Sequence, residues 1–453
     1  MTIQKPVVAG RFYPADPGEL DRTVQGLVQA APAWDVPPPK AVVLPHAGYR
    51  FSGAVAAMGA AVLRPEVSRV VVLGPSHRHA FDGVGLPDAQ AMETPLGQIP
   101  LDPDAIKLLL KMKDVNVVPE AFAQEHAIEV ELPFLQHRVR RFLLIPMVVG
   151  RIRPQRLAEI LETVWGGEET LIVISTDLTH FLTAEQAERV DGVTAQKIEL
   201  LESTGLTGEH ACGHAPLAAF LDCAKRRGLR LTRLALTHSG AVTGDNTRVV
   251  GYGAWMAHDP EQAHLPPACQ REAFTIAAKA LLSRARKGRA PAIDTGSFPM
   301  PLQSMGAAFV TLTREGRLRG CIGSLRAHQP LARDILGNAV KAGFEDPRFK
   351  PVTEDELKGT EIEVAVLSHP AEMSFDSEED LLSQLRPGRD GLILADGNRR
   401  GTFLPKVWES LNTTEMFLNG LKVKAGLDRD HWSGTLTVQR YVTESFKGRI
   451  TAG

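Results

Sequence analysis

Three short apolar runs in the first half of the chain each end at residues that can bind a metal or move a proton. Residues 41–44 lead to Pro45 and His46, residues 70–73 to Gly74 and His77, and residues 171–174 to Asp177 and His180. Such β-branched runs are typical of strands buried on both faces of an α/β sheet. Ligands of these sheets bind just beyond the carboxyl ends of the strands. The pattern therefore predicts one shared polar site, and histidine with aspartate favours a metal.

The residue types narrow the kind of metal site. Two histidines and one carboxylate on one face, with open positions, are the usual ligands of non-haem Fe(II) enzymes that handle oxygen. His46 and His77 follow strands that can be neighbours, so they are the first two candidates. The residues alone leave the third ligand open. The candidates for it are Asp177, His180, Glu125, His126 and Cys212.

Cys212 stands just before a helical pattern over residues 217–226. A cysteine at a helix N-terminus has its thiolate favoured by unpaired backbone N–H groups and by the helix dipole. We therefore expect a thiolate here that a metal or an electrophile can use. His126 and His180 then remain for proton transfer, and Asp177 for fixing a ring tautomer or anchoring substrate.

The elements that position these residues alternate between strand and helix. Helical patterns over residues 53–63, 154–163 and 184–203 follow predicted strands, which predicts a mainly parallel or mixed sheet covered by helices on both faces. The second half reads differently and predicts an α+β domain. Its expected elements are a hairpin over 307–313 and 318–322, strands over 361–367 and 391–394, and helices over 330–343 and 413–424.

Length and composition bound the rest. At 453 residues the chain is long enough for two or three domains. A proline-rich polar stretch near residues 258–267 precedes a helical pattern that begins at Arg271. We therefore expect a first domain over 1–258, a linker over 259–268 and a second domain over 269–453.

Charge and cysteine content indicate the setting of the protein. Lysine and arginine number 51 and aspartate and glutamate 53, so bulk charge favours neither a nucleic acid nor an acidic membrane surface as partner. Four cysteines without a CxxC pair suit a reducing compartment. The sequence shows neither an apolar leader nor an 18-residue apolar run. We expect a cytoplasmic protein.

Five motifs of the first half occur in the order seen in the Memo family. They are Pro45-His46-Ala47-Gly48-Tyr49, Gly74-Pro75-Ser76-His77, Glu125-His126-Ala127-Ile128-Glu129, Ser175-Thr176-Asp177-Leu178-Thr179-His180 and Cys212-Gly213. The resemblance covers about residues 5–257, and the family is similar in fold to class III extradiol ring-cleaving dioxygenases. It implies that His46, His77 and Cys212 bind one metal, with Asp177 beside it and with His126 and His180 orienting oxygen and moving protons.

This resemblance sets the expected function. It implies an oxidoreductase, an Fe(II)-dependent dioxygenase acting on a catechol-type group of a small molecule or of a peptidyl aromatic residue. A thiolate ligand also suits copper or zinc. The alternative is a non-catalytic metal-binding or scaffold module that keeps the same fold.

The second half contains Leu318-Arg319-Gly320-Cys321-Ile322-Gly323, the hexapeptide that marks the AMMECR family. That resemblance covers about residues 269–448 and implies an α+β domain with a cleft beside Cys321. We expect this domain to recognise or present the substrate. Cys321 is a candidate second site, a nucleophile or redox thiol assisted by His328 or His369. The more common role of such a cysteine is a small residue that allows tight packing at a strand end.

The combination of the two domains resembles two parts of the AmmeMemoRadiSam set. The third part of that set is a radical S-adenosylmethionine enzyme, and this sequence has no CxxxCxxC motif for its iron–sulfur cluster. The resemblance therefore implies a separate radical S-adenosylmethionine enzyme as a partner. Joining the two domains raises their effective concentration for one another's substrates.

Overall fold

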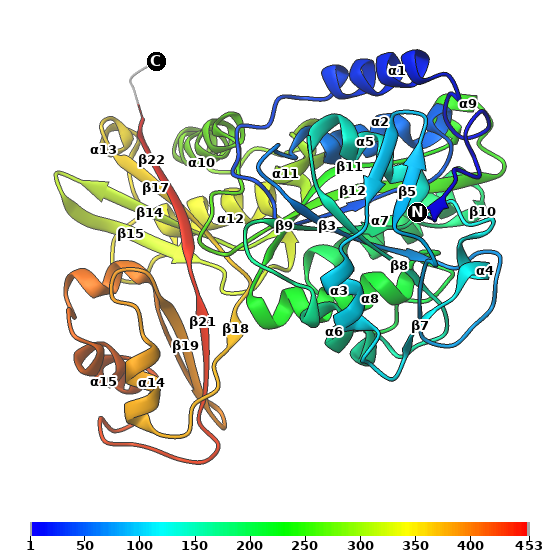
Figure 1. Cartoon of the computed structure of the whole chain (residues 1–453). Coiled ribbons are helices and arrows are strands. Elements are labelled where there is room, and N and C mark those ends of the chain that lie inside the picture. The colour runs from blue at the N-terminus through cyan, green and yellow to red at the C-terminus, as the bar shows by residue number, and fades with distance from the viewer. Residues whose placement is uncertain (1, 451–453) are drawn as a thin grey trace. The chain divides into compact units, whose positions relative to one another are not determined.

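The computed structural model describes residues 2–450, and the chain divides into two compact units (Figure 1). The first comprises the chain up to Ala224 together with Leu231–His258, and the second comprises Lys225–Arg230 together with the chain from Asp259 onward. No helix among residues 2–450 is long and apolar enough to cross a membrane.

The first unit is built around a mixed sheet of nine strands. Eight of them lie in the order β10-β12-β2-β9-β3-β8-β4-β7, and β11 pairs with β12. The central strands β2, β9, β3 and β8 are mutually parallel. Strand β12 runs antiparallel to β2 and β10, and β4 runs antiparallel to β8 but parallel to β7. The strands are β2 (Ala41–Leu44), β3 (Arg69–Pro75), β4 (Val84–Leu86), β7 (Val115–Val117), β8 (Leu143–Val149), β9 (Thr170–Ser175), β10 (His180–Leu182), β11 (Arg230–His238) and β12 (Val249–His258). A separate small sheet joins β1 (Ile3–Gln4), β5 (Ala91–Thr94) and β6 (Gly97–Pro100).

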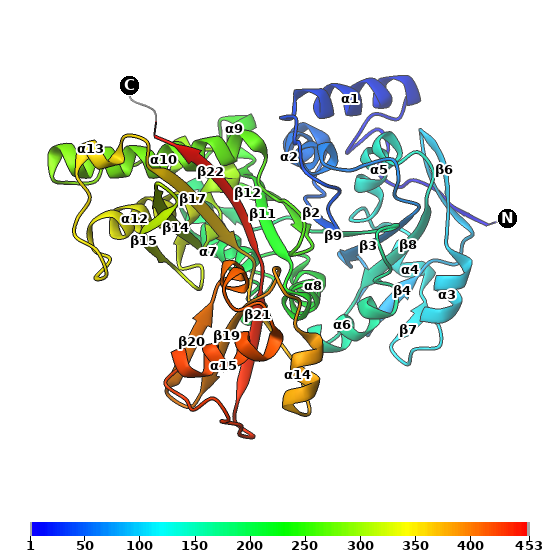
Figure 2. The same cartoon turned by 90° about the vertical axis from the view of Figure 1, so that its left-hand side faces the viewer.

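Helices cover both faces of this sheet, as two views at right angles show (Figures 1 and 2). Helices α1, α2 and α5 lie on one side of the strands and α6 and α8 on the other. The helices are α1 (Pro17–Ala30), α2 (Tyr49–Ala61), α3 (Pro103–Leu109), α4 (Pro119–Phe122), α5 (Leu132–Arg138), α6 (Pro154–Thr163), α7 (Ala184–Glu199), α8 (His214–Arg227) and α9 (Gly240–Thr243).

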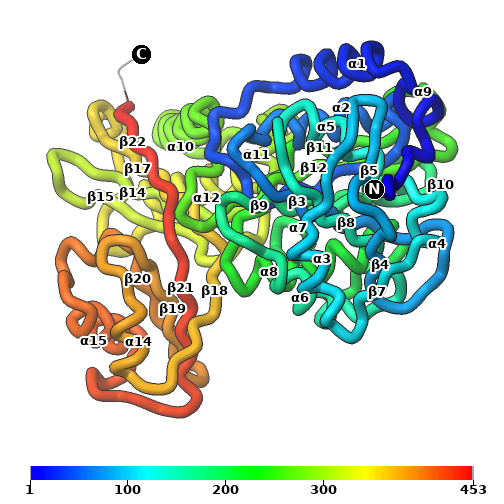
Figure 3. Tube along the Cα trace, in the orientation of Figure 1, coloured from blue at the N-terminus to red at the C-terminus, as the bar shows by residue number. Residues whose placement is uncertain are grey.

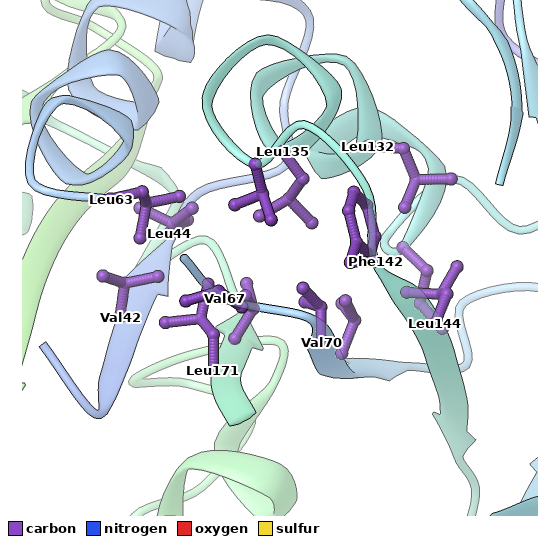
Figure 4. Packing of buried hydrophobic residues seen from close by; sticks show 14 of the residues in the cluster. Val42, Leu44, Leu63, Val67, Val70, Leu132, Leu135, Phe142, Leu144 and Leu171 are labelled. Carbon is purple, nitrogen blue, oxygen red and sulfur yellow. The ribbon is translucent and has the colours of Figure 1, made fainter. Parts of the chain in front are cut away.

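Apolar side chains from alternate positions of the central strands form the core under α2 and α5. Figure 4 shows Leu44 of β2 beside Leu63, which follows α2, and Leu144 of β8 near Phe142. All of these side chains are almost completely buried. Burial of this kind contributes roughly 1.5–3 kcal/mol for each large aliphatic side chain, so the sheet is a rigid platform for the loops at its edge.

The second unit contains two antiparallel sheets of four strands, in the orders β15-β14-β17-β22 and β18-β21-β19-β20, and a two-stranded sheet β13-β16. Helices α10 and α12 pack on the first sheet, and α14 and α15 on the second. The tube in Figure 3 traces the path of the chain through these elements. The strands are β13 (Met305–Gly306), β14 (Ala308–Arg314), β15 (Arg317–Gly323), β16 (Gln329–Pro330), β17 (Glu361–Leu367), β18 (Ala371–Glu372), β19 (Gly391–Asp396), β20 (Arg399–Phe403), β21 (Thr437–Tyr441) and β22 (Thr443–Arg449). The helices are α10 (Pro267–Lys287), α11 (Met300–Gln303), α12 (Leu331–Phe344), α13 (Glu354–Leu357), α14 (Glu378–Gln384) and α15 (Thr414–Lys424).

These architectures confirm the predicted fold classes, α/β with a mixed sheet followed by α+β. Helix α6 and strand β17 have the predicted bounds, and the predicted hairpin is β14–β15. Helix α2 begins at Tyr49 rather than near Gly53, directly after the loop that carries His46. The predicted strand over 318–322 corresponds to β15, in which Cys321 pairs with Thr311 of β14 two residues before the strand ends.

Candidate metal centre

The loops that follow β2, β3 and β9 bring the sequence-predicted residues together. His46, His77 and Asp177 each lie two residues beyond the end of their strand. Because β2, β9 and β3 are adjacent and parallel, their carboxyl ends meet at one edge of the sheet. His126 enters the same place from the loop between α4 and α5.

Three histidines form a cluster at this edge. One ring nitrogen each of His46, His77 and His126 lie within 4.8 Å of one another. The His46 and His77 ring centroids are 5.1 Å apart, and the rings are nearly perpendicular. His46 is 1% exposed, whereas the other two side chains reach the surface in part. The cluster is therefore a partly open site with a buried floor.

Glu125 orients His77. Its Oε1 lies 2.9 Å from His77 Nδ1, and its Oε2 accepts the backbone N–H of His77 at 2.6 Å. The same carboxylate accepts the backbone N–H groups of His126 and Ala127. Burial tends to raise the pKa of Glu125, but the hydrogen bonds outweigh burial and lower it. An ionised Glu125 accepts a hydrogen bond from His77 Nδ1–H, which leaves the lone pair of His77 on Nε2.

Ser175 orients His46. The Ser175 hydroxyl donates to the carbonyl of Ala127 at 2.5 Å, so its oxygen accepts a hydrogen bond from His46 Nδ1–H at 2.8 Å. The lone pair of His46 is therefore on Nε2. Both histidines present the same nitrogen to the cluster, although one is held by a carboxylate and the other by a hydroxyl.

Glu131 lies behind Ser175 and is 0% exposed. Burial raises the pKa of Glu131 well above its usual value, and the nearby Asp177 adds to this effect. Its Oε1 lies 3.3 Å from Ser175 Oγ. Since the Ser175 hydroxyl already donates to Ala127, a protonated Glu131 is the form that can donate to Ser175. The floor of the site thus contains a neutral carboxylic acid.

Cys212 lies beside His46. Its Sγ is 3.3 Å from His46 Nε2 and accepts the backbone N–H of Asp177 at 3.3 Å. Donor atoms that share one ion at 2.0–2.3 Å are about 3.3–3.6 Å apart, so this spacing fits two ligands of one metal. The expectation that Cys212 is a thiolate is wrong for the metal-free protein, because burial and the nearby Asp177 raise the pKa of this thiol to about 12. A coordinating cation is what would ionise this thiol.

His126 differs from the other two histidines in its orientation. Its ring stacks on His77 with an interplanar angle of 19° and a centroid distance of 4.9 Å. Ring-nitrogen lone pairs lie in the ring plane, so lone pairs of two stacked, nearly parallel rings do not converge on one point. Burial lowers the pKa of His126 to about 4, against the opposing effect of Glu125. His126 is therefore a neutral imidazole beside the cluster.

Asp177 and His180 flank the cluster. Asp177 Oδ1 accepts the backbone N–H of His46 at 2.9 Å, so this carboxyl anchors the loop rather than a ring tautomer. Burial raises the pKa of Asp177 to about 7. His180 Nδ1 lies 2.9 Å from the carbonyl of Leu178 and donates to it, which leaves Nε2 free. Burial lowers the pKa of His180, and the charge of His77 adds to this effect.

The candidate ligands fit one divalent metal ion that accepts both nitrogen and sulfur donors. They offer imidazole nitrogens with defined tautomers and a thiol, with ordered hydrogen-bond partners behind them. No role for Ser175 or Glu131 could be predicted from the sequence. The residues around them do not show whether a serine or a glutamate supports a ligand or only packs in the core. Glu125 was one of the open candidates for a third ligand, and its place immediately before His126 was the signal that it belongs to the site.

Cys321 has different surroundings. The Thr311 hydroxyl donates to Cys321 Sγ at 3.2 Å, and the Cys321 backbone N–H donates to Asp346 Oδ2 at 2.9 Å. Among residues 2–450, no hydrogen bond joins His328 or His369 to this thiol. The role of Cys321 as a second site stays a prediction.

The two glycines near Cys321 serve packing. A Cβ at Gly320 would lie 2.0 Å from the carbonyl oxygen of Ala342 in α12, and one at Gly323 would lie 2.2 Å from the ring of Phe309. The motif therefore lets a helix backbone and an aromatic ring approach β15 closely.

Comparison with known proteins shows two families that match successive parts of the chain. Residues 4–256 match the family described as Memo-like protein, and residues 274–446 match AMMECR1. A MEMO1 family protein of Aquifex aeolicus is 33% identical over 264 residues, which are 56% of this chain and 98% of that protein. A MEMO1 family protein of Methanosarcina mazei is 34% identical over 276 residues, again 56% of this chain and 98% of that protein.

A crystal structure of an uncharacterized protein from Pyrococcus horikoshii is also similar, with 31% identity over 39% of this chain and 90% of that chain and a TM-score of 0.37. With most of the chain matched by the Memo-like family, and nearly the full length of its relatives covered, the chain belongs to the Memo family and joins its Memo domain to an AMMECR1 domain.

Proposed function

We propose that the Memo domain is an Fe(II)-dependent dioxygenase that cleaves the ring of a catechol-type substrate. The observation that carries this proposal is the pair of histidines, His46 and His77, whose Nδ1 atoms are each held by a hydrogen-bond partner, so that the lone pairs are on the Nε2 atoms at the same edge of the sheet. Pre-oriented imidazoles in a partly open site are what a catalytic metal requires.

His46, His77 and Cys212 would hold the metal. The 3.3 Å spacing of Cys212 Sγ and His46 Nε2 supports the thiol as third donor, and the stacking of His126 on His77 argues against a third imidazole. When bound, the metal supplies the Lewis acidity and the redox chemistry by which a catechol and dioxygen react.

The chain itself would move the protons. His126 is neutral at pH 7 and partly exposed, so it can accept a proton from a substrate hydroxyl. His180 keeps a free Nε2 and can act as the second acid–base group. Asp177 would keep the His46 loop in place through its bond to the backbone N–H. In the overall reaction both atoms of dioxygen enter the product, and one ring carbon–carbon bond next to the diol breaks.

A second candidate function is metal binding without oxygen chemistry, in a protein that works with a radical S-adenosylmethionine enzyme. The thiol of Cys212 favours this candidate, because a sulfur donor suits zinc or copper(I) as well as iron and is readily oxidised. In either case we propose that the AMMECR1 domain recognises or presents the substrate.

Oxygen uptake separates the two candidates. The full chain is loaded anaerobically with Fe(II) and mixed with a panel of catechols that includes peptidyl dihydroxyphenylalanine. We expect oxygen consumption and a yellow ring-opened product, both lost in His46→Ala. One bound metal without oxygen uptake on any substrate would instead favour the metal-binding candidate.

A further inference from the structure

Phe181 has an unusual backbone for a bulky residue. Its φ is 63°, in the left-handed region that side chains other than glycine, asparagine and aspartate rarely adopt. Its side chain is nevertheless 61% exposed, so no core packing explains this conformation. Local strain of this kind persists where the surrounding structure fixes it, often at a functional site.

The conformation places the Phe181 ring next to His180. In a regular strand, consecutive side chains point to opposite faces. Here the register of β10 against β12 shifts between His180 and Leu182, which leaves Phe181 as an extra residue. As a result the rings of His180 and Phe181 are only 5.7 Å apart, at an interplanar angle of 73°. Bulges next to active sites commonly redirect one side chain in this way.

Arg248, the residue immediately before β12, packs on the Phe181 ring. Its guanidinium carbon lies 4.3 Å above the Phe181 ring, and the residue is exposed. Among residues 2–450, no carboxylate lies within ion-pair distance of it. A guanidinium stacked on a ring is held in place while its in-plane N–H groups stay available to an anion.

We infer that Phe181 and Arg248 form a binding subsite for an anionic substituent of the aromatic substrate, beside His180 at the rim of the metal centre. This inference rests on the proposed function for the identity of the aromatic ring. Arg248 donates to a carboxylate carried on a short side chain of the substrate, and Phe181 holds the guanidinium at the required place. The substrate class is thus a catechol that bears a carboxylate, rather than an unsubstituted or cationic catechol.

Binding to the metal-free full chain tests this subsite without any turnover. The two probes are 3,4-dihydroxyphenylacetate and its neutral amide, which differ only in charge. We expect the carboxylate to bind about fivefold more tightly, as an exposed ion pair of about 1 kcal/mol provides, and less so as salt is raised. The Arg248→Gln variant loses this preference, and Arg248→Lys keeps only part of it.

Arg151 offers a matched control, since it is an exposed arginine paired with Asp82 elsewhere in the unit. The Arg151→Gln variant keeps the preference. A preference that survives in Arg248→Gln, or equal binding or no binding of both probes to the unmodified protein, overturns the inference.

The Phe181 backbone is tested separately. Glycine adopts a positive φ without strain, so Phe181→Gly should melt at a higher temperature than Phe181→Ala while both variants lose the preference. The oxygen-uptake experiment decides the proposed function independently. Charge discrimination through Arg248 without oxygen uptake would keep the subsite and discard the dioxygenase, and uptake without charge discrimination would do the reverse.

Discussion

Two cysteines in this chain stand next to a glycine, yet their surroundings differ completely. Cys212 precedes Gly213, and its Sγ lies 3.3 Å from the ring nitrogen of His46. Cys321 follows Gly320, and its Sγ accepts a hydrogen bond from Thr311 within an ordinary antiparallel pair of strands. The first cysteine lies where loops from several parallel strands converge, and the second lies inside one hairpin. A thiol is therefore a candidate metal ligand where loops from several strands meet, and a neighbouring glycine does not by itself indicate this role.

Loss of His77 should have the largest effect and tests the first half of the comparison. Removing one of the two pre-oriented imidazoles in His77→Ala should weaken metal affinity more than about 100-fold, beyond the 10–100-fold cost of losing a supporting residue. Isothermal titration with Fe(II) or Zn(II) under anaerobic conditions measures this affinity.

The matched control is Cys321→Ala, which should keep one metal per chain at full affinity. If Cys321→Ala lost the metal while His77→Ala kept it, the metal site would have to be placed in the AMMECR1 domain.

Replacement of Gly320 by alanine should have the next largest effect, and it tests whether the motif around Cys321 serves packing. The added Cβ would lie 2.0 Å from the carbonyl oxygen of Ala342, so β15 and α12 must separate. We expect Gly320→Ala to lower the free energy of unfolding by about 2 kcal/mol. Gly337→Ala is the control, since it lies in α12 with open space at its Cβ and should be neutral or stabilising. Urea denaturation measures both variants, and equal stability would show that Gly320 is not needed for packing.

The residues of the candidate metal site could be predicted from the sequence better than the residues that hold them in place. His46, His77 and Asp177 could be placed together because they follow apolar runs, and the carboxyl ends of parallel strands share an edge. The hydrogen bond between Ser175 and His46 and the neutral state of Glu131 could not be predicted, because they depend on contacts between residues 129 and 44 positions apart. The close approach of Ala342 to Gly320 and of Phe309 to Gly323 could not be predicted either, because it depends on tertiary packing.

Glu131 provides a pH-dependent effect on stability. Its raised pKa means that the folded protein keeps a proton which the unfolded chain loses above its own pKa near 4.3. The stability from this proton is complete below that pH and is lost as pH rises. Glu131→Gln removes the titration, so its stability relative to the unmodified protein should increase by about 1.4 kcal/mol per pH unit between pH 5 and 7.

Urea denaturation of both proteins at pH 5, 6 and 7 measures this difference. Glu66→Gln, which changes an exposed carboxyl, should show no such trend. A constant difference for Glu131→Gln would mean that Glu131 is ionised in the folded protein, and the hydrogen-bond assignment around Ser175 would have to be reversed.

Replacement of Cys321 by serine should have the smallest effect and is the sharpest test of the contrast between the two cysteines. Serine is nearly the same size, and its oxygen can accept the hydrogen bond from Thr311, so stability should change by less than about 1 kcal/mol. Cys212→Ser should instead reduce metal retention, because a neutral hydroxyl replaces a sulfur donor next to His46. Metal content and oxygen uptake measured on both variants decide the matter. If Cys321→Ser abolished oxygen uptake while metal stayed bound, Cys321 would take part in the reaction without binding the metal.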